Sequence, residues 1–315
     1  MKKVLIGDCR DLLKDIETES IDCVVTSIPY WGQRDYENPA QIGWEKSPSD
    51  FVAIIVDVFR EVFRVLKKDG NVFINVGDSY ISKPTGSLGN SMTITGGKRN
   101  QASSLNRMDK SKCGIPEKNR ALIPQRLSIA LQDSGWFVRQ EIIWDKPNGM
   151  PYSSKDRCRT SHEQVWHITK TSKNWFDIDA LDNPESPSPV YEICQECEGD
   201  GCEYCRDLGI ITFEYKSRRS VWSIPTQPHQ NENHTAIMPD KLVADLILCG
   251  CIEGGTVLDP FGGTGTTGLV AELLNRNSVI IELNGEYLKN FNTPNNRLFD
   301  KKVAQQNRSK QWKKN

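Results

Sequence analysis

Residues 26–31, Thr-Ser-Ile-Pro-Tyr-Trp, follow a hydrophobic run and carry side chains suited to the chemistry of a planar amino group. Such a nitrogen is a weak nucleophile until acceptors hold its two hydrogens. The Ser27 hydroxyl and the backbone carbonyl beside the rigid Pro29 can be those acceptors. Tyr30 and Trp31 can stack on a base extruded from a duplex. The segment predicts group transfer to the exocyclic nitrogen of a nucleobase, although the string alone also fits an ordinary loop.

Residues 256–268 run from a hydrophobic strand through closely spaced glycines into a helix. Glycines let the backbone approach a ligand, and the first amides of the helix point to the same place. Gly263, Gly265 and Gly268 fit the G-x-G-x-x-G pattern, and Glu282 ends the next predicted strand, where a ribose hydroxyl would be bound. Taken alone, this cofactor loop fits a nicotinamide dinucleotide site. A phosphate-binding P-loop is disfavoured, because no Lys-Ser or Lys-Thr pair follows the glycines.

Both segments lie in an alternation of strand and helix patterns that must hold them in place. Strands are predicted at residues 4–6, 21–26, 71–76, 136–144, 164–169, 256–258 and 278–282, and helices at residues 51–66, 121–134, 239–251, 266–274 and from 285 onward. This alternation predicts an α/β fold with a mostly parallel sheet, whose ligand loops lie at the carboxyl ends of the strands.

With the two segments in this order, the sequence resembles the DNA amino-methyltransferases, in the circularly permuted beta-type group where the catalytic loop precedes the cofactor loop. Residues 26–36 resemble the family's T-S-P-P-Y-W-G-x-R-D-Y segment, and residues 259–267 resemble its D-P-F-x-G-x-G-T-T segment. Residues 77–80, 144–148, 220–226 and 281–284 also fit the family. The chain departs from the pattern at Ile28, where the family usually has proline.

The resemblance implies a Rossmann-like sheet that binds S-adenosyl-L-methionine (SAM) and methylates a flipped base in double-stranded DNA. Cytosine N4 is favoured over adenine N6, because the family's cytosine enzymes more often have serine at the position of Ser27. The implied catalytic residues are Ser27, Pro29 and Tyr30. The implied cofactor-binding residues are Asp259, Phe261, Gly263, Gly265 and Thr266 at the methionine part, Glu282 at the ribose, Asp8 near the adenine, and His234, which closes the pocket. Asp8 could instead cap a helix, and His234 could be a surface residue.

Four of the ten cysteines, Cys194, Cys197, Cys202 and Cys205, form two closely spaced C-x-x-C pairs. Thiolates at this spacing can surround one structural zinc, and a segment poor in apolar residues would gain its fold from the metal. Reduced free thiols or a redox pair are the alternatives.

The expected domain organisation follows from these motifs. It comprises a catalytic half at residues 1–147 with a basic loop at 81–120, a target-recognition region with the zinc knuckle at 148–230, a cofactor-binding half at 231–298 and a basic tail at 299–315. Lys98 and Arg99 lie in the basic loop and are expected to contact DNA phosphates. The alternative is that the basic loop and the basic tail are solvated, flexible segments without a nucleic-acid partner.

The composition limits the other classes of protein. The 315 residues are 37% hydrophobic with a net charge of −1, and no apolar run approaches the roughly 20 residues that cross a bilayer. We therefore expect a cytoplasmic enzyme with no membrane partner, which could act with a companion restriction endonuclease in restriction-modification. The rival classes are an NAD-dependent dehydrogenase and a non-catalytic zinc-containing DNA-binding protein.

Overall fold

The computed structural model describes residues 1–33, 38–83, 108–149, 155–181, 190–193, 196–198, 200, 202–203, 210–213, 218–227 and 238–288. The chain divides into two compact units. The larger unit comprises residues 1–176 and 220–315, and the smaller one comprises residues 177–219.

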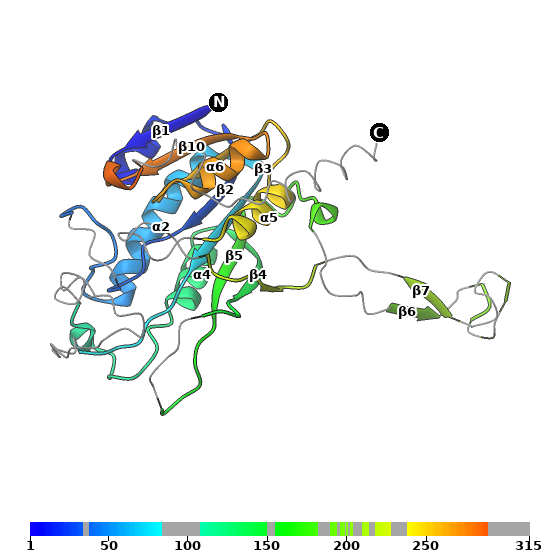
Figure 1. Cartoon of the computed structure of the whole chain (residues 1–315), viewed down its shortest axis with the longest axis horizontal. Coiled ribbons are helices and arrows are strands. Elements are labelled where there is room, and N and C mark those ends of the chain that lie inside the picture. Colours follow the sequence, from blue (N-terminus) through cyan, green and yellow to red (C-terminus); the bar gives the residue numbers. More distant parts are fainter. Residues whose placement is uncertain are drawn as a thin grey trace. The chain divides into compact units, whose positions relative to one another are not determined.

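The larger unit is built on an eight-stranded sheet, which confirms the α/β class (Figure 1). Its spatial order is β1-β10-β9-β2-β3-β5-β4-β8. Neighbours from β1 to β3 are parallel, whereas β5 is antiparallel to both β3 and β4, and β8 is parallel to β4. The strands are β1 (Lys2–Ile6), β2 (Ile21–Ser27), β3 (Leu66–Val76), β4 (Phe137–Asp145), β5 (His162–Thr169), β8 (Val221–Ser223), β9 (Thr256–Asp259) and β10 (Asn277–Glu282).

Helices cover both faces of this sheet (Figure 1). One layer contains α1 (Cys9–Leu12), α2 (Pro48–Val65) and α4 (Ile123–Asp133), and the other contains α5 (Asp240–Gly250) and α6 (Thr266–Leu273). Alternate residues of β3 serve the two layers, because successive strand side chains point to opposite faces. Val72 and Ile74 belong to the core cluster with α2, whereas Phe73 packs so closely on Gly250 of α5 that an added Cβ there would lie 2.3 Å from the ring.

Short 3-10 helices complete the described secondary structure. They are η1 (Leu13–Asp15), η2 (Lys110–Lys112), η3 (Ile178–Ala180) and η4 (Gly285–Leu288). The last of these stands where a longer helix from residue 285 was predicted, and most of that prediction lies outside the described residues. In the part of the chain that the structure describes, no helix is long and apolar enough to cross a membrane.

The smaller unit contains a two-stranded antiparallel sheet of β6 (Val190–Ile193) and β7 (Ile210–Phe213). Cys197 and Cys202 follow β6 and precede β7 in the sequence, and both are half-buried. The other two predicted zinc ligands, Cys194 and Cys205, lie outside the described residues. No group of three or more potential metal-binding side chains occurs among the residues described, so the zinc knuckle stays a prediction.

Candidate active site

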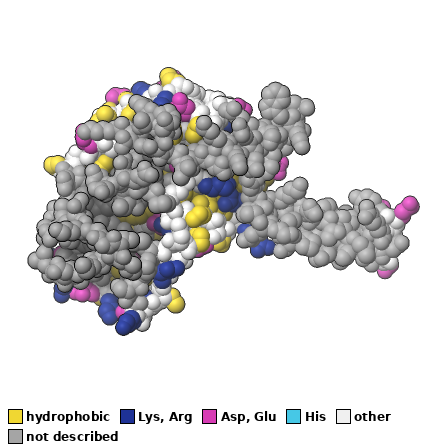
Figure 2. Space-filling view, viewed as in Figure 1, with side chains coloured by type: hydrophobic (Ala, Val, Ile, Leu, Met, Phe, Trp, Pro, Cys, Tyr) yellow, Lys and Arg dark blue, Asp and Glu magenta, His cyan; other side chains and the backbone are white. Residues whose placement is uncertain are grey.

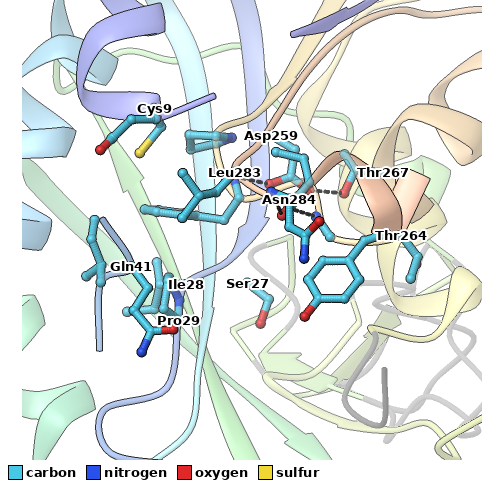
Figure 3. Close-up of a pocket in the computed structure, with 18 of the residues that line it drawn as sticks. Cys9, Ser27, Ile28, Pro29, Gln41, Asp259, Thr264, Thr267, Leu283 and Asn284 are labelled. Carbon is cyan, nitrogen blue, oxygen red and sulfur yellow. Dashed lines mark hydrogen bonds between the residues drawn. The ribbon is translucent and has the colours of Figure 1, made fainter. Parts of the chain in front are cut away.

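The two motif-bearing loops meet at the carboxyl edge of the sheet. β2 and β9 are parallel neighbours, with Val24 opposite Leu258, so the segments that follow them emerge side by side. Both line one cavity, which Figure 3 shows with Ile28 and Pro29 on one wall, Thr264 and Thr267 on the other, and Ser27 between them. The predicted site residues that line this cavity are Asp8, Ser27, Pro29, Tyr30, Asp259, Phe261, Gly263, Thr266 and Glu282.

Asp259 lies in the cavity wall and joins the two loops. Its Oδ1 accepts hydrogen bonds from Thr26 Oγ1 at 2.7 Å and from the Phe261 amide at 3.0 Å, and its Oδ2 accepts one from Thr267 Oγ1 at 2.8 Å. Burial raises the pKa of this carboxyl to about 6, and the same three hydrogen bonds oppose the rise. Asp259 thus links the end of β2, which leads into the segment with Ser27, to the cofactor loop, and it also lines the cavity.

Glycine residues allow the backbone of the cofactor loop to turn sharply and to pack closely. Gly263 and Gly265 have φ angles of 52° and 78°, in the left-handed region where a side chain would be strained. Gly265 is the N-cap residue of α6 and does not line the cavity, so its position makes it a residue of the turn. Gly262 packs against β10, where an added Cβ would lie 2.2 Å from Ile280 Cγ2.

Glu282 closes the loop from the end of β10. It is 8% exposed, and its two carboxylate oxygens accept hydrogen bonds from the Gly263 amide at 2.6 Å and the Asn284 amide at 2.9 Å. Burial raises the pKa of Glu282 to about 7, against the effect of these hydrogen bonds. Each carboxylate oxygen keeps a lone pair for a further donor in the cavity.

Asp8 lies at the helix cap that the sequence offered as an alternative, and it also lines the cavity. It is the N-cap of α1, accepting from the Arg10 amide at 2.9 Å, and it lines the cavity. Burial opposes ionisation, but hydrogen bonds and the charge of Arg10 outweigh it and lower the pKa of Asp8. Arg10 also donates to the carbonyl of Ala40 at 2.9 Å, which ties a further wall of the cavity to this carboxylate.

Ile28, the departure from the family pattern, is held by a backbone hydrogen bond and by core packing. The amide hydrogen that proline would lack is directed at the Asn75 carbonyl, with an N to O distance of 3.3 Å. The Ile28 side chain is 1% exposed and belongs to the hydrophobic core. An isoleucine therefore serves the turn by making one extra backbone bond.

Trp31 does not lie where the sequence placed it. Its side chain is 1% exposed within the core, outside the cavity lining, and its indole N–H donates to the Glu45 carbonyl at 2.9 Å. Adjacent residues of a turn point in different directions, and here only Tyr30 of the aromatic pair faces the cavity. The prediction that Trp31 stacks on a base does not fit this position.

Three polar residues beside the catalytic turn were not predicted as site residues from the sequence. Asn75 donates through Nδ2 to Ser27 Oγ at 3.4 Å, Glu163 accepts the Tyr30 hydroxyl at 2.7 Å, and Lys146 forms an ion pair with Glu163. Lys146 lies in a segment that resembles the family, whereas Asn75 and Glu163 sit within ordinary strand patterns. Only the strand order brings them together.

Several predicted contacts fall outside the described residues, namely His234, Lys98 and Arg99. The described flanks of the basic loop carry paired charges, with Lys83 at 3.0 Å from Glu117 and Lys118 at 3.3 Å from Asp156. On the face in Figure 2, Lys and Arg side chains of described residues occur in small separate groups, some beside acidic side chains and one, near the centre, beside hydrophobic ones.

Comparison with protein families classifies the chain. The family model described as DNA methylase matches residues 21–293, which include both loops. The chain belongs to the DNA methylase family. The resemblance seen in the sequence is confirmed, and the family match leaves the NAD-dependent dehydrogenase without support.

Curated relatives of this DNA methylase match along most of their length. Type II methyltransferase M.SmaI of Serratia marcescens is 37% identical over 285 residues, which cover 90% of this chain and 87% of that protein. Type II methyltransferase M.XycI of Xanthomonas campestris pv. cyanopsidis is 38% identical over 282 residues, covering 90% and 83%.

Solved structures share the fold of this DNA methylase. PvuII DNA methyltransferase (cytosine-N4-specific) superposes with a TM-score of 0.63 at 21% identity, covering 98% of this chain and 91% of that one. A putative DNA modification methylase of Thermus thermophilus, solved in complex with S-adenosyl-L-methionine, gives a TM-score of 0.56 at 22% identity, covering 91% and 90%.

Proposed function

We propose that this DNA methylase transfers a methyl group from SAM to the N4 amino group of cytosine in double-stranded DNA. The observation that carries the proposal is the shared cavity, in which Ser27 and Tyr30 face the glycine loop at Gly263. Group transfer needs both reactants at near-attack distance, and a single cavity built from both loops meets that need.

The cofactor half of the cavity suits a nucleoside with a cationic centre. Glu282 would accept the ribose hydroxyls with the lone pairs that its backbone partners leave. Phe261, Gly263 and Thr266 would surround the methionine part, and Asp8 would lie towards the adenine. The Thermus thermophilus structure that shares this fold was solved with SAM, which supports the same choice. When bound, SAM supplies an electrophilic methyl group on sulfur.

The other half of the cavity suits a flipped base. The Ser27 hydroxyl and the carbonyl preceding Pro29 would hold the amino hydrogens and draw the nitrogen towards a tetrahedral, nucleophilic geometry. Tyr30 would stack on the base. Cys9 also lines the cavity, but burial raises its pKa to about 12, so it is a neutral thiol and no nucleophile. The amino nitrogen would itself attack the methyl group, so the proposed transfer is direct and needs no covalent enzyme intermediate.

Cytosine is preferred to adenine on two grounds. Ser27 stands at the motif position where serine is more common among the cytosine enzymes of the family. The PvuII enzyme, whose name specifies cytosine N4, shares the fold. Adenine N6 is the alternative, because both amino groups need the same acceptors.

The relatives' names suggest the biological setting. M.SmaI and M.XycI are Type II methyltransferases, so a restriction-modification system with a companion restriction endonuclease is the setting we propose. Within the target-recognition region predicted at residues 148–230, β5 and β8 belong to the main sheet, so the smaller unit at residues 177–219 would read the DNA sequence, with structural zinc held by the four cysteines predicted above. Metal analysis of the purified protein tests this part, since absence of zinc together with four freely titratable thiols would exclude it.

Nucleoside analysis tests the reaction and the base together. The protein is incubated with mixed-sequence DNA and methyl-labelled SAM, the DNA is digested to nucleosides, and these are identified by mass. We expect labelled N4-methyl-2′-deoxycytidine among the nucleosides. Labelled N6-methyladenine would overturn the choice of base, and no labelled nucleoside from a protein that binds SAM would overturn the proposed activity.

A further inference from the structure

A polar network lies at the same sheet edge as the catalytic turn, on strands that follow much later in the chain. β5 is antiparallel to β3, with Val165 opposite Asn75, so the amino end of β5 lies at the carboxyl edge of β3. Glu163 near the start of β5 thereby reaches the site, 133 residues away from Tyr30 in the sequence. Lys146 directly follows β4, which ends at the same edge.

Glu163 is the centre of this network. Its Oε2 accepts hydrogen bonds from the Tyr30 hydroxyl at 2.7 Å and from Asn75 Nδ2 at 3.1 Å. Its Oε1 forms an ion pair with the Lys146 ammonium, and both side chains are largely buried, at 16% and 19% exposure. A hydrogen bond to a charged acceptor is stronger than a neutral one, so the carboxylate holds both donors firmly.

The carboxylate fixes which way Asn75 faces. Asn75 is 2% exposed, and its amide nitrogen, the end that can donate, is turned towards Glu163. The same nitrogen lies 3.4 Å from Ser27 Oγ, so Ser27 receives a hydrogen bond from the protein side. Within the described residues Asn75 Oδ1 has no hydrogen-bond partner, but the opposite orientation would set this oxygen against the Glu163 carboxylate oxygen. The Ser27 hydroxyl hydrogen and one lone pair remain for the base.

The same carboxylate fixes the plane of the Tyr30 ring. The hydroxyl donates to Glu163 at 2.7 Å, and its oxygen lies 3.1 Å from Asn75 Nδ2, which shares its two hydrogens among Tyr30, Glu163 and Ser27. Gly77 packs against the ring edge, where an added Cβ would lie 3.0 Å from Cε2. Tyr30 is therefore held at its tip and its side, and its face is what it can offer to a base.

We propose that Glu163 is a positioning residue for methyl transfer: through Asn75 it directs the Ser27 hydroxyl, through Tyr30 it sets the stacking face, and Lys146 holds it in place. The proposal rests on the proposed function, because positioning matters for turnover only if a base is methylated here. Glu163 itself need not touch the base or the cofactor.

A spectroscopic experiment reads the network without relying on activity. The protein is labelled with tyrosine carrying ¹³C at Cζ, and the Tyr30 signal is assigned by its loss in Tyr30→Phe. Glu163→Gln should shift this signal, because the acceptor changes from a carboxylate to an amide. The control Glu141→Gln, a neutralised glutamate of β4 outside the network, should leave it in place. An unmoved Tyr30 signal in Glu163→Gln overturns the proposal.

Kinetics on the DNA substrate test the consequence. Loss of charge-assisted hydrogen bonds predicts that Glu163→Gln lowers kcat by about 10- to 100-fold. The Kd for SAM, measured by calorimetry, should stay within about twofold, because no contact of the network reaches the cofactor loop. Glu141→Gln should match the wild type in both. A Glu163→Gln enzyme with unchanged kcat, or with kcat and SAM affinity lost together, contradicts a positioning role.

A double-mutant cycle identifies the route of the effect. If Glu163 acts through Tyr30, the loss of kcat in Tyr30→Phe with Glu163→Gln should be smaller than the product of the two single losses. Independent, multiplicative losses would overturn that route.

Should Glu163→Gln fail to fold, Tyr30→Phe carries the test. This variant should lower kcat at constant SAM affinity, and an unchanged kcat would overturn the proposal. If the wild type methylates no DNA, the proposed function fails, and the Tyr30 signal still decides the network.

Discussion

Thr26 Oγ1 donates a 2.7 Å hydrogen bond to Asp259 Oδ1 across the interface of β2 and β9. Both residues are buried, at 0% and 3% exposure, and each stands at the point where its strand gives way to a functional loop. A pair so enclosed has no water to replace a lost partner. This side-chain contact, together with the Thr267 hydroxyl at 3.3 Å from the Val25 carbonyl and the strand pairing, thus fixes the distance between the catalytic turn and the cofactor loop.

Replacing Thr26 with valine should weaken this junction. The change keeps the side-chain shape but leaves a buried carboxylate with one donor fewer, which costs about 1–3 kcal/mol of unfolding free energy. Urea denaturation measures the loss, and the matched variant Thr26→Ser, which keeps a hydroxyl, should lose less. A Thr26→Val protein as stable as the wild type would contradict this role of the hydrogen bond, because valine keeps the methyl group and loses only the hydroxyl.

SAM affinity should depend on pH through Glu282. Its pKa lies at about 7, so the carboxylate that accepts ribose hydroxyls and attracts a cationic cofactor forms as the pH rises through that value. The Kd for SAM should therefore fall with rising pH, by at most about tenfold per unit on the acid side. Calorimetry across about pH 6 to 8 measures it. Glu282→Gln should bind more weakly and lose the step near neutrality, whereas a retained step assigns the titration to another group.

The close packing of Gly262 predicts a steric effect distinct from backbone strain. In Gly262→Ala the new Cβ would lie 2.2 Å from Ile280 Cγ2, so the cofactor loop must move away from β10. We expect at least a tenfold loss of SAM affinity, which corresponds to about 1.4 kcal/mol. Gly254→Ala is the control, since its φ of 77° brings strain but its Cβ would meet nothing within 4 Å. Equal SAM affinity in the two variants would mean that the loop tolerates the displacement.

His167 should make the fold acid-sensitive. It lies stacked between Phe73 and Phe176 at ring separations of 4.7 and 5.4 Å, its Nε2 is 2.9 Å from Asn71 Oδ1, and burial, aided by the charge of Arg139, lowers its pKa to about 4. The unfolded chain takes up this proton near the ordinary pKa of 6.5, so stability falls as the pH drops from that value towards 4, by up to about 3 kcal/mol.

The measurement for His167 is a difference between two proteins. Asp259 and Glu282 have raised pKa values and contribute stability that is lost in the opposite direction, as the pH rises. Unfolding free energies of the wild type and His167→Gln are therefore compared at several pH values. The difference in unfolding free energy between the two proteins should decrease as the pH falls below 6.5. A constant difference would show that His167 is not protonated on unfolding.

The strands that carry both loops could be predicted from hydrophobic periodicity. Residues 21–26 and 256–258 were expected as strands, and β2 and β9 extend each by one residue. The glycine pattern identified the cofactor loop because left-handed φ angles and close packing leave glycine few substitutes. These features are local, so a single sequence reveals them.

The rest of the site depends on strand order, which periodicity does not encode. Glu163 lies beside Asn75 only because β5 runs antiparallel to β3, over a separation of 88 residues. The core position of Trp31 could not be predicted for a related reason, since residue type alone does not tell which of two adjacent aromatic side chains enters the core. A buried network of polar residues on non-consecutive strands therefore became visible only in the fold.

The most direct measurement of the central claim compares Ser27→Ala with Ser20→Ala. Ser20 precedes β2 at its opposite end and donates to the Glu17 carbonyl at 2.7 Å, which makes it a matched control. If Ser27 holds the base amino group, its loss should lower labelled methyl transfer to DNA by about 100-fold or more while SAM binding stays as in the wild type. Ser20→Ala should retain both. Equal loss of methyl transfer and SAM binding in Ser27→Ala would contradict a cavity divided between base and cofactor.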